Sequence, residues 1–406
     1  MNVLTYIQGD PALYPIDWSP DKIQDFKQTL LKWYDATKRD LPWRNTHNPY
    51  YIWVSEIMLQ QTQVVTVIPY YERFIATLPT IDDLATADEE LLLGLWQGLG
   101  YYSRVRNMQV AAKQIVDQFN GEMPRTMKEL LTLKGIGPYT AAAIGSIAFG
   151  LVEPAIDGNL MRVTARLFEL DADISQPKSR KLFAAILYQL IDSDRPGDFN
   201  QALMDLGATI MTPANLTPED NPLKAFDLSY QHGTAHLYPV KKKKVKATEH
   251  YLLAYIVQNT QGDWLIRKHE EGELLTGLWH FPMIEQTLVM EAASAEELVE
   301  PFNDWWSELL NNTDEAQVIT FETSNLKINQ QMLPFGEIEG AALLPTVKHI
   351  FSHRIWHLQL VPILMTGEDR LPVASETMRW QKPKAIRDLP ISTLQQKLLL
   401  ALENYL

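Results

Sequence analysis

Glu56 is the first side chain whose surroundings suggest chemistry. It lies in the string Ile52-Trp53-Val54-Ser55-Glu56-Ile57-Met58-Leu59, one helical turn after Ile52 and among apolar residues. Helical spacing lets such a side chain face a sheltered cavity. An apolar surround disfavours the ionised carboxylate and raises its pKa, so a proton is available near neutral pH. We therefore predict that Glu56 is a general acid; a surface or capping role is the alternative.

A second carboxylate, Asp157, follows a glycine turn by about twenty residues. The turn, Leu133-Lys134-Gly135-Ile136-Gly137-Pro138, lies between apolar helical stretches. Glycines let the backbone bend tightly and present N–H groups to an anion at a helix start. Such a turn can hold a nucleic-acid phosphate without reading the base sequence. Asp157 is predicted to be the catalytic partner of Glu56, or alternatively the N-cap of a helix at residues 159–168.

The elements that must position these residues form a helical block from Ser19-Pro20 to about residue 210. Ser19 can cap the first helix and Pro20 suits its first turn. Apolar residues then recur at helical spacing. We expect an all-α region over residues 1–232, which includes a loop at 211–227.

The second block has a different texture. Short β-rich runs are expected at 252–257, 264–266, 357–365 and 378–381, with helices near 295–310 and 393–405. An α+β domain is therefore predicted over residues 249–406. Residues 233–248, with five lysines at 241–246, are predicted to be an extended basic connector. They are expected to form a solvated linker, with contact to DNA phosphate as the functional alternative.

Composition sets limits on the kind of protein. The net charge is −14, divided as −8 over residues 1–240, +5 over 241–246 and −11 beyond. Acidity weakens long-range steering toward DNA, although a local basic surface and backbone amides can still hold phosphates. The chain has no cysteine, which excludes disulfides, thiolate catalysis and cysteine-bound clusters. Without an apolar run of membrane length, and with a polar start at residues 1–10, a soluble cytoplasmic protein is expected.

Several motifs together resemble one enzyme family. The strings are Leu41-Pro42-Trp43-Arg44, Ser55-Glu56-Ile57-Met58-Leu59-Gln60-Gln61-Thr62-Gln63-Val64, Gly98-Leu99-Gly100-Tyr101-Tyr102 and Ile156-Asp157-Gly158-Asn159. With the glycine turn, they resemble the MutY-type adenine DNA glycosylases of the helix-hairpin-helix superfamily. The resemblance runs from Leu41 into the C-terminal block. It implies an all-α helix-hairpin-helix glycosylase domain followed by a Nudix-like domain, and base-excision repair of adenine mispaired with 8-oxoguanine or guanine.

The resemblance also assigns chemical roles. Glu56 would protonate adenine and later activate water, while Asp157 would stabilise the oxocarbenium-like sugar or form a covalent intermediate. Tyr139 occupies the place of the nucleophilic lysine of lyase-active relatives, so a monofunctional enzyme that leaves an abasic site is implied. Asn159 would bond within the site.

Further residues match DNA-contacting positions of the family. An enzyme that acts on a base in a duplex must extrude it and fill the gap. Gln61 and Tyr101 match wedging positions; Arg44, Thr62 and Leu99 match the walls of the base pockets. The turn at Gly135 and Gly137 would hold the phosphate backbone of the DNA.

The missing cysteines are the main departure from the family pattern. The positions that correspond to iron–sulfur ligands appear as Met211, Pro218, Asn221 and Asp227, none of which supplies a thiolate. A clusterless branch is implied, whose loop is stabilised by packing. The packing residues are expected to be Pro213, Pro218, Pro222, Leu216, Leu223 and Phe226.

The C-terminal block resembles the family's lesion-sensing domain. Gly277-Leu278-Trp279-His280-Phe281-Pro282 and Phe351-Ser352-His353 carry this resemblance, and no Nudix box is found. Ser352 can donate or accept a hydrogen bond, which suits a purine altered at C8 and N7, with Phe351 and His353 beside it. A loop held locally by Ser352 is the alternative.

The implied partner is double-stranded DNA with 8-oxoguanine:adenine or guanine:adenine mispairs, bound by a monomer at the bacterial nucleoid. No cofactor is implied for catalysis and no metal-binding residues are predicted, although the family allows a structural monovalent or calcium ion at the hairpin. Two other functions stay open. A lyase-active pyrimidine glycosylase is opposed by Tyr139 and the loop at Ser352, and a non-catalytic mismatch-binding protein is opposed by Glu56 and Asp157.

Overall fold

The computed structural model describes residues 14–242, 246–286, 295–311, 326–328, 346–365 and 376–404. The polar start at residues 1–10 and residues 243–245 of the basic connector lie outside this range. The chain divides into two compact units: Met1–Ala87 with Ser103–Lys244, and Asp88–Tyr102 with Val245–Leu406. Within the described residues, no helix combines the length and the hydropathy needed to cross a membrane.

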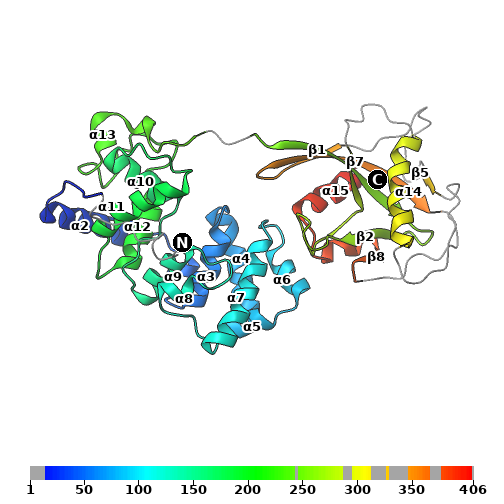
Figure 1. Ribbon diagram of the computed structural model, residues 1–406, viewed down its shortest axis with the longest axis horizontal. Helices are drawn as coiled ribbons and strands as arrows, with labels where there is room; N and C mark the ends of the chain where they lie inside the picture. Colours follow the sequence, from blue (N-terminus) through cyan, green and yellow to red (C-terminus); the bar gives the residue numbers. More distant parts are fainter. Residues whose placement is uncertain are drawn as a thin grey trace. The chain divides into compact units, whose positions relative to one another are not determined.

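The first unit is helical (Figure 1). Its helices are α2 (Pro20–Thr37), α3 (Pro49–Leu59), α4 (Val64–Thr77), α5 (Ile81–Thr86), α7 (Ser103–Phe119), α8 (Met127–Leu130), α9 (Pro138–Phe149), α10 (Gly158–Phe168), α11 (Arg180–Leu190), α12 (Pro196–Thr209) and α13 (Leu228–His232), with 3₁₀ turns η2 (Pro42–Arg44), η3 (Pro177–Ser179) and η4 (Ala235–Leu237).

The first helix begins as the sequence predicts. The side chain of Ser19 accepts a hydrogen bond from the Lys22 amide, and Pro20 occupies the first turn of α2. Its apolar stripe, which includes Phe26 and Leu30, packs into a core shared with α10, α11 and α12. This core fixes α10 and α12, the helices that begin after Asp157 and carry Asp205 of the site described below.

Helices α3 and α9 pack against each other and are buried nearly all round. A helix that is apolar on every side belongs in the interior. The small residues Ala141, Ala142 and Ala143 of α9 are fully or almost fully buried. Glu56, at 5% exposure, is the acidic residue of α3, so its carboxyl is held in the interior of the first unit.

Hydrogen bonds and packing hold the loop at 211–227. Asn221 Nδ2 donates to Asp227 Oδ2 over 3.2 Å, and Leu223 and Phe226 are buried. Arg162 donates to the Met211 carbonyl, and Arg166 donates to the carbonyls of Thr212 and Asn215. The packing expected of Pro213 and Leu216 is wrong, because both side chains are exposed.

The second unit contains α6 (Glu89–Trp96) and a mixed sheet. Its strands are β1 (Thr248–Gln258), β2 (Trp264–Lys268), β3 (Trp279–His280), β4 (Met283–Gln286), β5 (Leu326–Ile328), β6 (Thr346–Ile350), β7 (Arg354–Met365) and β8 (Met378–Gln381), with α14 (Ala295–Asn311), η7 (Pro383–Asp388) and α15 (Thr393–Glu403). The principal order is β3-β2-β1-β7-β5; β4 pairs with β1, β6 with β7 and β8 with β2. Strands β1 and β7 are parallel, from Thr248 opposite Arg354 to Gln258 opposite Leu364.

Each face of this sheet has its own core. Leu252 and Ala254 of β1 face a cluster with α15, while Leu253 and Tyr255 face a second cluster with α14. In Figure 1 these two helices, red and yellow, flank the sheet. Burial on both faces explains why β1 reads as a nearly continuous apolar run. The predicted fold class, an all-α domain followed by an α+β domain, is confirmed.

Candidate active site

Most of the predicted site residues, including all four predicted catalytic ones, line one cavity of about 760 Å³ in the first unit. Its walls come from the turn at Pro42, from α3 and the residues after it, from the glycine hairpin and from the start of α10. The predicted site residues that line it are Arg44, Glu56, Gln61, Thr62, Gly135, Gly137, Tyr139, Asp157 and Asn159. Residues that are far apart in the chain therefore meet at this one cavity.

Glu56 is the buried acid of the cavity. Burial raises the pKa of Glu56 to about 7, the hydrogen bond from Tyr139 lowers it, the charge of Asp157 raises it and that of Arg44 lowers it. The environment therefore favours a carboxyl group that exchanges its proton near neutral pH. A group with this pKa is suited to act first as an acid and then as a base.

Tyr139 lies in the first turn of α9 and contacts the acid directly. Its hydroxyl donates to Oε2 of Glu56 over 2.5 Å. Burial, with the charges of Glu56 and Asp157, raises the pKa of Tyr139 well above its usual value. The phenol therefore stays protonated and acts as a hydrogen-bond donor to Glu56.

Asp157 does cap a helix, as its alternative reading predicts. Its Oδ1 accepts from the Leu160 amide over 2.7 Å at the start of α10, and its Oδ2 accepts from Nδ2 of Asn159 over 3.0 Å. Asn159 is in turn fixed by Arg162, whose Nη2 donates to Oδ1 over 2.7 Å. Burial raises the pKa of Asp157, and these hydrogen bonds oppose that effect. Capping and a place in the cavity are compatible roles for this side chain.

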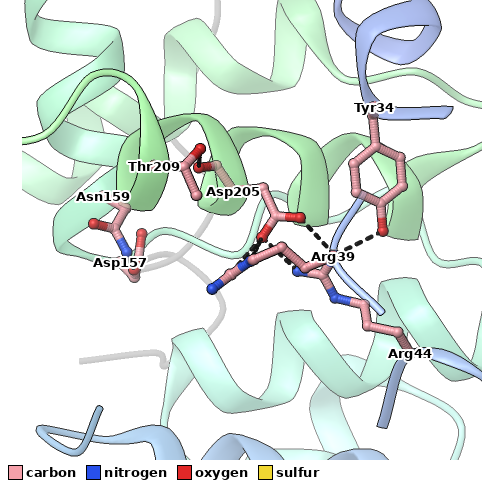
Figure 2. Close-up of polar contacts among 7 residues, drawn as sticks. All are labelled: Tyr34, Arg39, Arg44, Asp157, Asn159, Asp205 and Thr209. Carbon is pink, nitrogen blue, oxygen red and sulfur yellow. Dashed lines mark hydrogen bonds and ion pairs between the residues drawn. The ribbon is translucent and has the colours of Figure 1, made fainter. Parts of the chain in front are cut away.

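Asp205, a buried acid that the sequence interpretation missed, bonds to two arginines that line the cavity (Figure 2). Arg44 donates to Oδ2 through Nη1 over 2.8 Å and to Oδ1 through Nη2 over 2.9 Å, and Arg39 donates to Oδ1 through Nε over 2.8 Å. Arg44 also donates to the Tyr34 hydroxyl over 3.0 Å. Burial alone would raise the pKa of Asp205, but Arg44 and Arg39 hold it below its usual value. The carboxylate thus fixes two cations that line the cavity.

The signal for this network is present in the chain. Arg39 and Arg44 flank the Leu41-Pro42-Trp43 string, and Asp205 is the one acid in the apolar stretch Ala202-Leu203-Met204-Asp205-Leu206. A charged residue inside such a stretch is buried only when it is paired.

The two hairpin glycines have different roles. Gly135 has φ of +78°, and a Cβ there would lie 2.8 Å from Cβ of Asn107, so both backbone and space require glycine. Gly137 is the N-cap of α9 with φ of −89°, a conformation open to any residue. The expectation that both glycines are needed for the bend is therefore wrong for Gly137. A Cβ at Gly137 would meet no described atom within 4 Å, and the backbone there stays approachable.

Two predicted wedge residues share an uncommon backbone conformation. Gln61, at the cavity, has φ of +60°, and Tyr101, in the second unit, has φ of +48°. Residues other than glycine rarely adopt this region, and such strain is concentrated at functional sites. Leu99, from the same segment as Tyr101, is buried.

The remaining predicted residues lie in the second unit, in the turn between β6 and β7. Phe351 packs edge-on against Trp356, with ring centroids 4.9 Å apart, while Ser352 and His353 are exposed. The hydroxyls of Ser352 and Tyr101 lie 2.5 Å apart. The turn is thus anchored by an aromatic side chain and presents polar groups at its tip.

Comparison with known proteins agrees with this arrangement. The family described as HhH-GPD superfamily base excision DNA repair protein matches residues 54–189, and the NUDIX domain family matches residues 253–401. Glu56, Tyr139 and Asp157 thus lie in the part of the chain that is similar to the base excision DNA repair family, and the mixed sheet lies in the part that is similar to the NUDIX domain family.

Relatives narrow the class further. The chain is 32% identical to the adenine DNA glycosylase of Rattus norvegicus over 94% of its own length and 78% of that protein. It is 34% identical to the adenine DNA glycosylase of Arabidopsis thaliana over 93% of its own length, but spans only 63% of that relative. A solved thermostable thymine-DNA glycosylase is 27% identical with a TM-score of 0.48, covering 52% of this chain and 98% of that chain. The chain belongs to the adenine DNA glycosylase family.

Proposed function

We propose that this protein is a monofunctional adenine DNA glycosylase, which hydrolyses adenine from mispairs with 8-oxoguanine or guanine and leaves an abasic site. The observation that carries the proposal is the buried Glu56, with a pKa raised to about 7, in one cavity with Tyr139 and Asp157. The family of the chain supports the choice of adenine.

The chemistry follows from the leaving group. Adenine leaves poorly as an anion, so protonation by Glu56 weakens the bond to the sugar. Asp157 then stabilises positive charge on the deoxyribose or bonds to it transiently, and Glu56 accepts a proton from the attacking water. Different environments of two carboxyl groups separate their roles in this way.

Release of the base without strand cleavage is the second part of the proposal. A lyase needs an amine that forms a Schiff base, and a phenol such as Tyr139 cannot do so. Among the described residues that line the cavity, the cationic side chains are Arg39, Arg44 and Arg180, and there is no lysine.

The proposed DNA contacts use both units. Backbone amides near Gly137 would hold phosphate, Gln61 and Tyr101 would fill the stack, and Arg44, Thr62 and Leu99 would line the base pockets. Phe351, Ser352 and His353 would read the lesion. The partner is double-stranded DNA bound by a monomer in the cytoplasm, at the bacterial nucleoid; no cofactor takes part in catalysis, and a monovalent or calcium ion would bind only structurally at the hairpin carbonyls.

The test is single-turnover cleavage of duplexes that carry adenine opposite 8-oxoguanine, guanine or thymine, with and without hot alkali. We expect strand breaks on the first two duplexes, and only after alkali. Breaks without alkali would reveal a lyase. Tight binding without base release would instead identify a mismatch-binding protein.

A further inference from the structure

Two histidines and a glutamate meet at one edge of the Nudix-like sheet, in the second unit and outside the cavity described above. His269 follows β2 directly, His280 ends β3, and Glu273 lies in the connection between these strands. In the antiparallel ladder Arg267 is opposite His280, and the His269 amide bonds to the Leu278 carbonyl over 3.0 Å. The ladder therefore brings the two imidazoles together, and their ring centroids lie 3.5 Å apart.

The tautomers of both rings follow from their partners. Nδ1 of His269 lies 3.0 Å from Oε2 of Glu273, and Nδ1 of His280 lies 2.5 Å from the Phe281 carbonyl oxygen. Carboxylates and carbonyls only accept hydrogen bonds, so each Nδ1 carries a proton. Nε2 of neither ring has a hydrogen-bond acceptor beside it, so these contacts favour the neutral tautomer with a lone pair on Nε2.

Neither lone pair has a partner in the described part of the chain. Nε2 of His269 and Nε2 of His280 are buried without a hydrogen bond, and the two residues are only 7% and 3% exposed. Leaving a buried acceptor unsatisfied costs about 1–3 kcal/mol. Two such atoms side by side need an explanation, because native structures contain few of them.

We propose that His269, His280 and Glu273 bind one divalent transition-metal ion, of which Zn²⁺ is the best fit. One donor atom from each of the three residues lies within 4.8 Å of the others. The ion would replace the proton that lies between Nδ1 of His269 and Oε2 of Glu273, and it would also bind Nε2 of His280. The Nδ1–H of His280 donates to the Phe281 carbonyl, and metal-bound histidines usually donate their other ring N–H in this way. Imidazole with carboxylate suits Zn²⁺, whereas Mg²⁺ and Ca²⁺ prefer oxygen alone.

The charges around the cluster are compatible with a cation. Arg267 bonds to Oε1 of Glu273 over 2.9 Å and to Glu270 over 3.3 Å, so it orients the carboxylate and leaves Oε2 toward His269. Donor atoms on a tetrahedral zinc ion lie roughly 3.4 Å apart. Glu273, whose side chain is 35% exposed, provides both the movement that closes the site and a path from solvent.

The experiment uses the full chain, treated with chelator and dialysed, and titrated with Co²⁺ and with Zn²⁺ against a chromophoric chelator. The protein has no cysteine, so thiolates do not contribute to the signal. We expect one tight ion per chain, a tetrahedral Co²⁺ absorption spectrum, a melting temperature raised by Zn²⁺, and no response to Mg²⁺. His280→Gln should weaken binding by more than about tenfold, since even loss of an outer partner of a metal ligand costs about 10–100-fold.

Matched controls come from the same sheet. His250 pairs with Glu285 over 2.6 Å, and His357 pairs with Glu249, but neither pair has a second buried imidazole. His250→Gln and His357→Gln should leave the tight ion unchanged. Glu273→Gln, at a partly exposed position, repeats the test if His280→Gln fails to fold. Absence of stoichiometric binding, or binding that persists in both ligand variants, would overturn the proposal.

Discussion

The hydroxyl of Tyr139 donates a 2.5 Å hydrogen bond to Oε2 of Glu56, which joins helices α9 and α3 at the cavity. Since the raised pKa of Tyr139 keeps it protonated, Oε2 is occupied as an acceptor. The exchangeable proton of Glu56 therefore belongs on Oε1, the oxygen that Tyr139 leaves free. A carboxyl group whose proton position is already fixed does not have to reorganise its hydrogen bonds when adenine enters the cavity.

The first prediction is that Glu56→Gln abolishes base release while DNA binding persists. The amide keeps an acceptor for Tyr139 but cannot transfer a proton, and general acid catalysis contributes about 10²–10⁴-fold. Single-turnover cleavage and a binding assay on the same duplex measure the two effects. Glu153→Gln is the matched control, because Glu153 also accepts from a tyrosine, Tyr188, and has a raised pKa, but does not line the cavity. Equal losses in both variants would contradict the assignment.

A second prediction concerns pH. Glu56 must be protonated to act as an acid, and its pKa lies at about 7. The acid form therefore predominates below this value and is lost as the pH rises through it. At subsaturating enzyme, where the rate reports free-enzyme groups, base release should fall by about tenfold per pH unit on the alkaline side. A profile that stays flat across neutral pH would exclude Glu56 as the titrating acid.

Tyr139→Phe should move this alkaline limb to higher pH. The hydrogen bond from Tyr139 lowers the pKa of Glu56, so its removal lets burial raise that pKa further. The measurement is the pH–rate profile of the variant beside that of the wild type. Tyr188→Phe, which removes the equivalent bond to Glu153, should leave the profile where it is. A shift to lower pH in Tyr139→Phe would show that the tyrosine acts differently.

Most of the fold could be predicted from periodicity and boundary residues. The Ser19-Pro20 start of α2 and the strand Met378–Gln381 were found at their observed positions. The strand predicted at 252–257 is longer and spans Thr248–Gln258, because its polar first residues also pair with β7 in a parallel ladder. Such long-range pairing leaves no local mark in the sequence.

Site residues could be predicted where a short local sequence motif contains them. They could not be predicted where residues distant in the chain come together. Glu56 is conspicuous as an acid in an apolar helix, and the cavity does contain it. Asp205 was missed because its partners, Arg39 and Arg44, lie more than 160 residues earlier in the chain. His269 and His280 were missed for another reason: strand register, not spacing, brings them together.

Asp157→Asn separates the two roles of Asp157. Asparagine caps helices about as well as aspartate, so α10 should keep its start. The negative charge that would stabilise the sugar cation is lost, and base release should fall by at least about 10²-fold. Thermal unfolding and single-turnover cleavage report the two effects. Asp157→Ala should lose activity and also about 0.5–2 kcal/mol of stability. Full activity in Asp157→Asn would leave capping as its only role.

Asp205→Asn should damage both stability and the pH profile. Asp205 accepts hydrogen bonds from Arg39 and Arg44 while 2% exposed, and removing one partner of a buried ion pair costs about 3–5 kcal/mol. The charge of Arg44 lowers the pKa of Glu56 and would then be uncompensated. The alkaline limb should therefore move to lower pH, opposite to the effect of Tyr139→Phe.

Asp198→Asn, on the same helix, is the control for this variant. Asp198 pairs with Arg195 where both side chains are 37% exposed, so its loss should cost no more than about 1 kcal/mol. Denaturant unfolding measures the loss of stability in the two variants, and their pH–rate profiles measure any shift of the alkaline limb. If Asp205→Asn lost stability without any movement of the alkaline limb, the ion pairs of Asp205 with Arg39 and Arg44 would have a structural role only. Movement of the limb in Asp205→Asn but not in Asp198→Asn would show that Asp205 sets the acidity of Glu56 through Arg44.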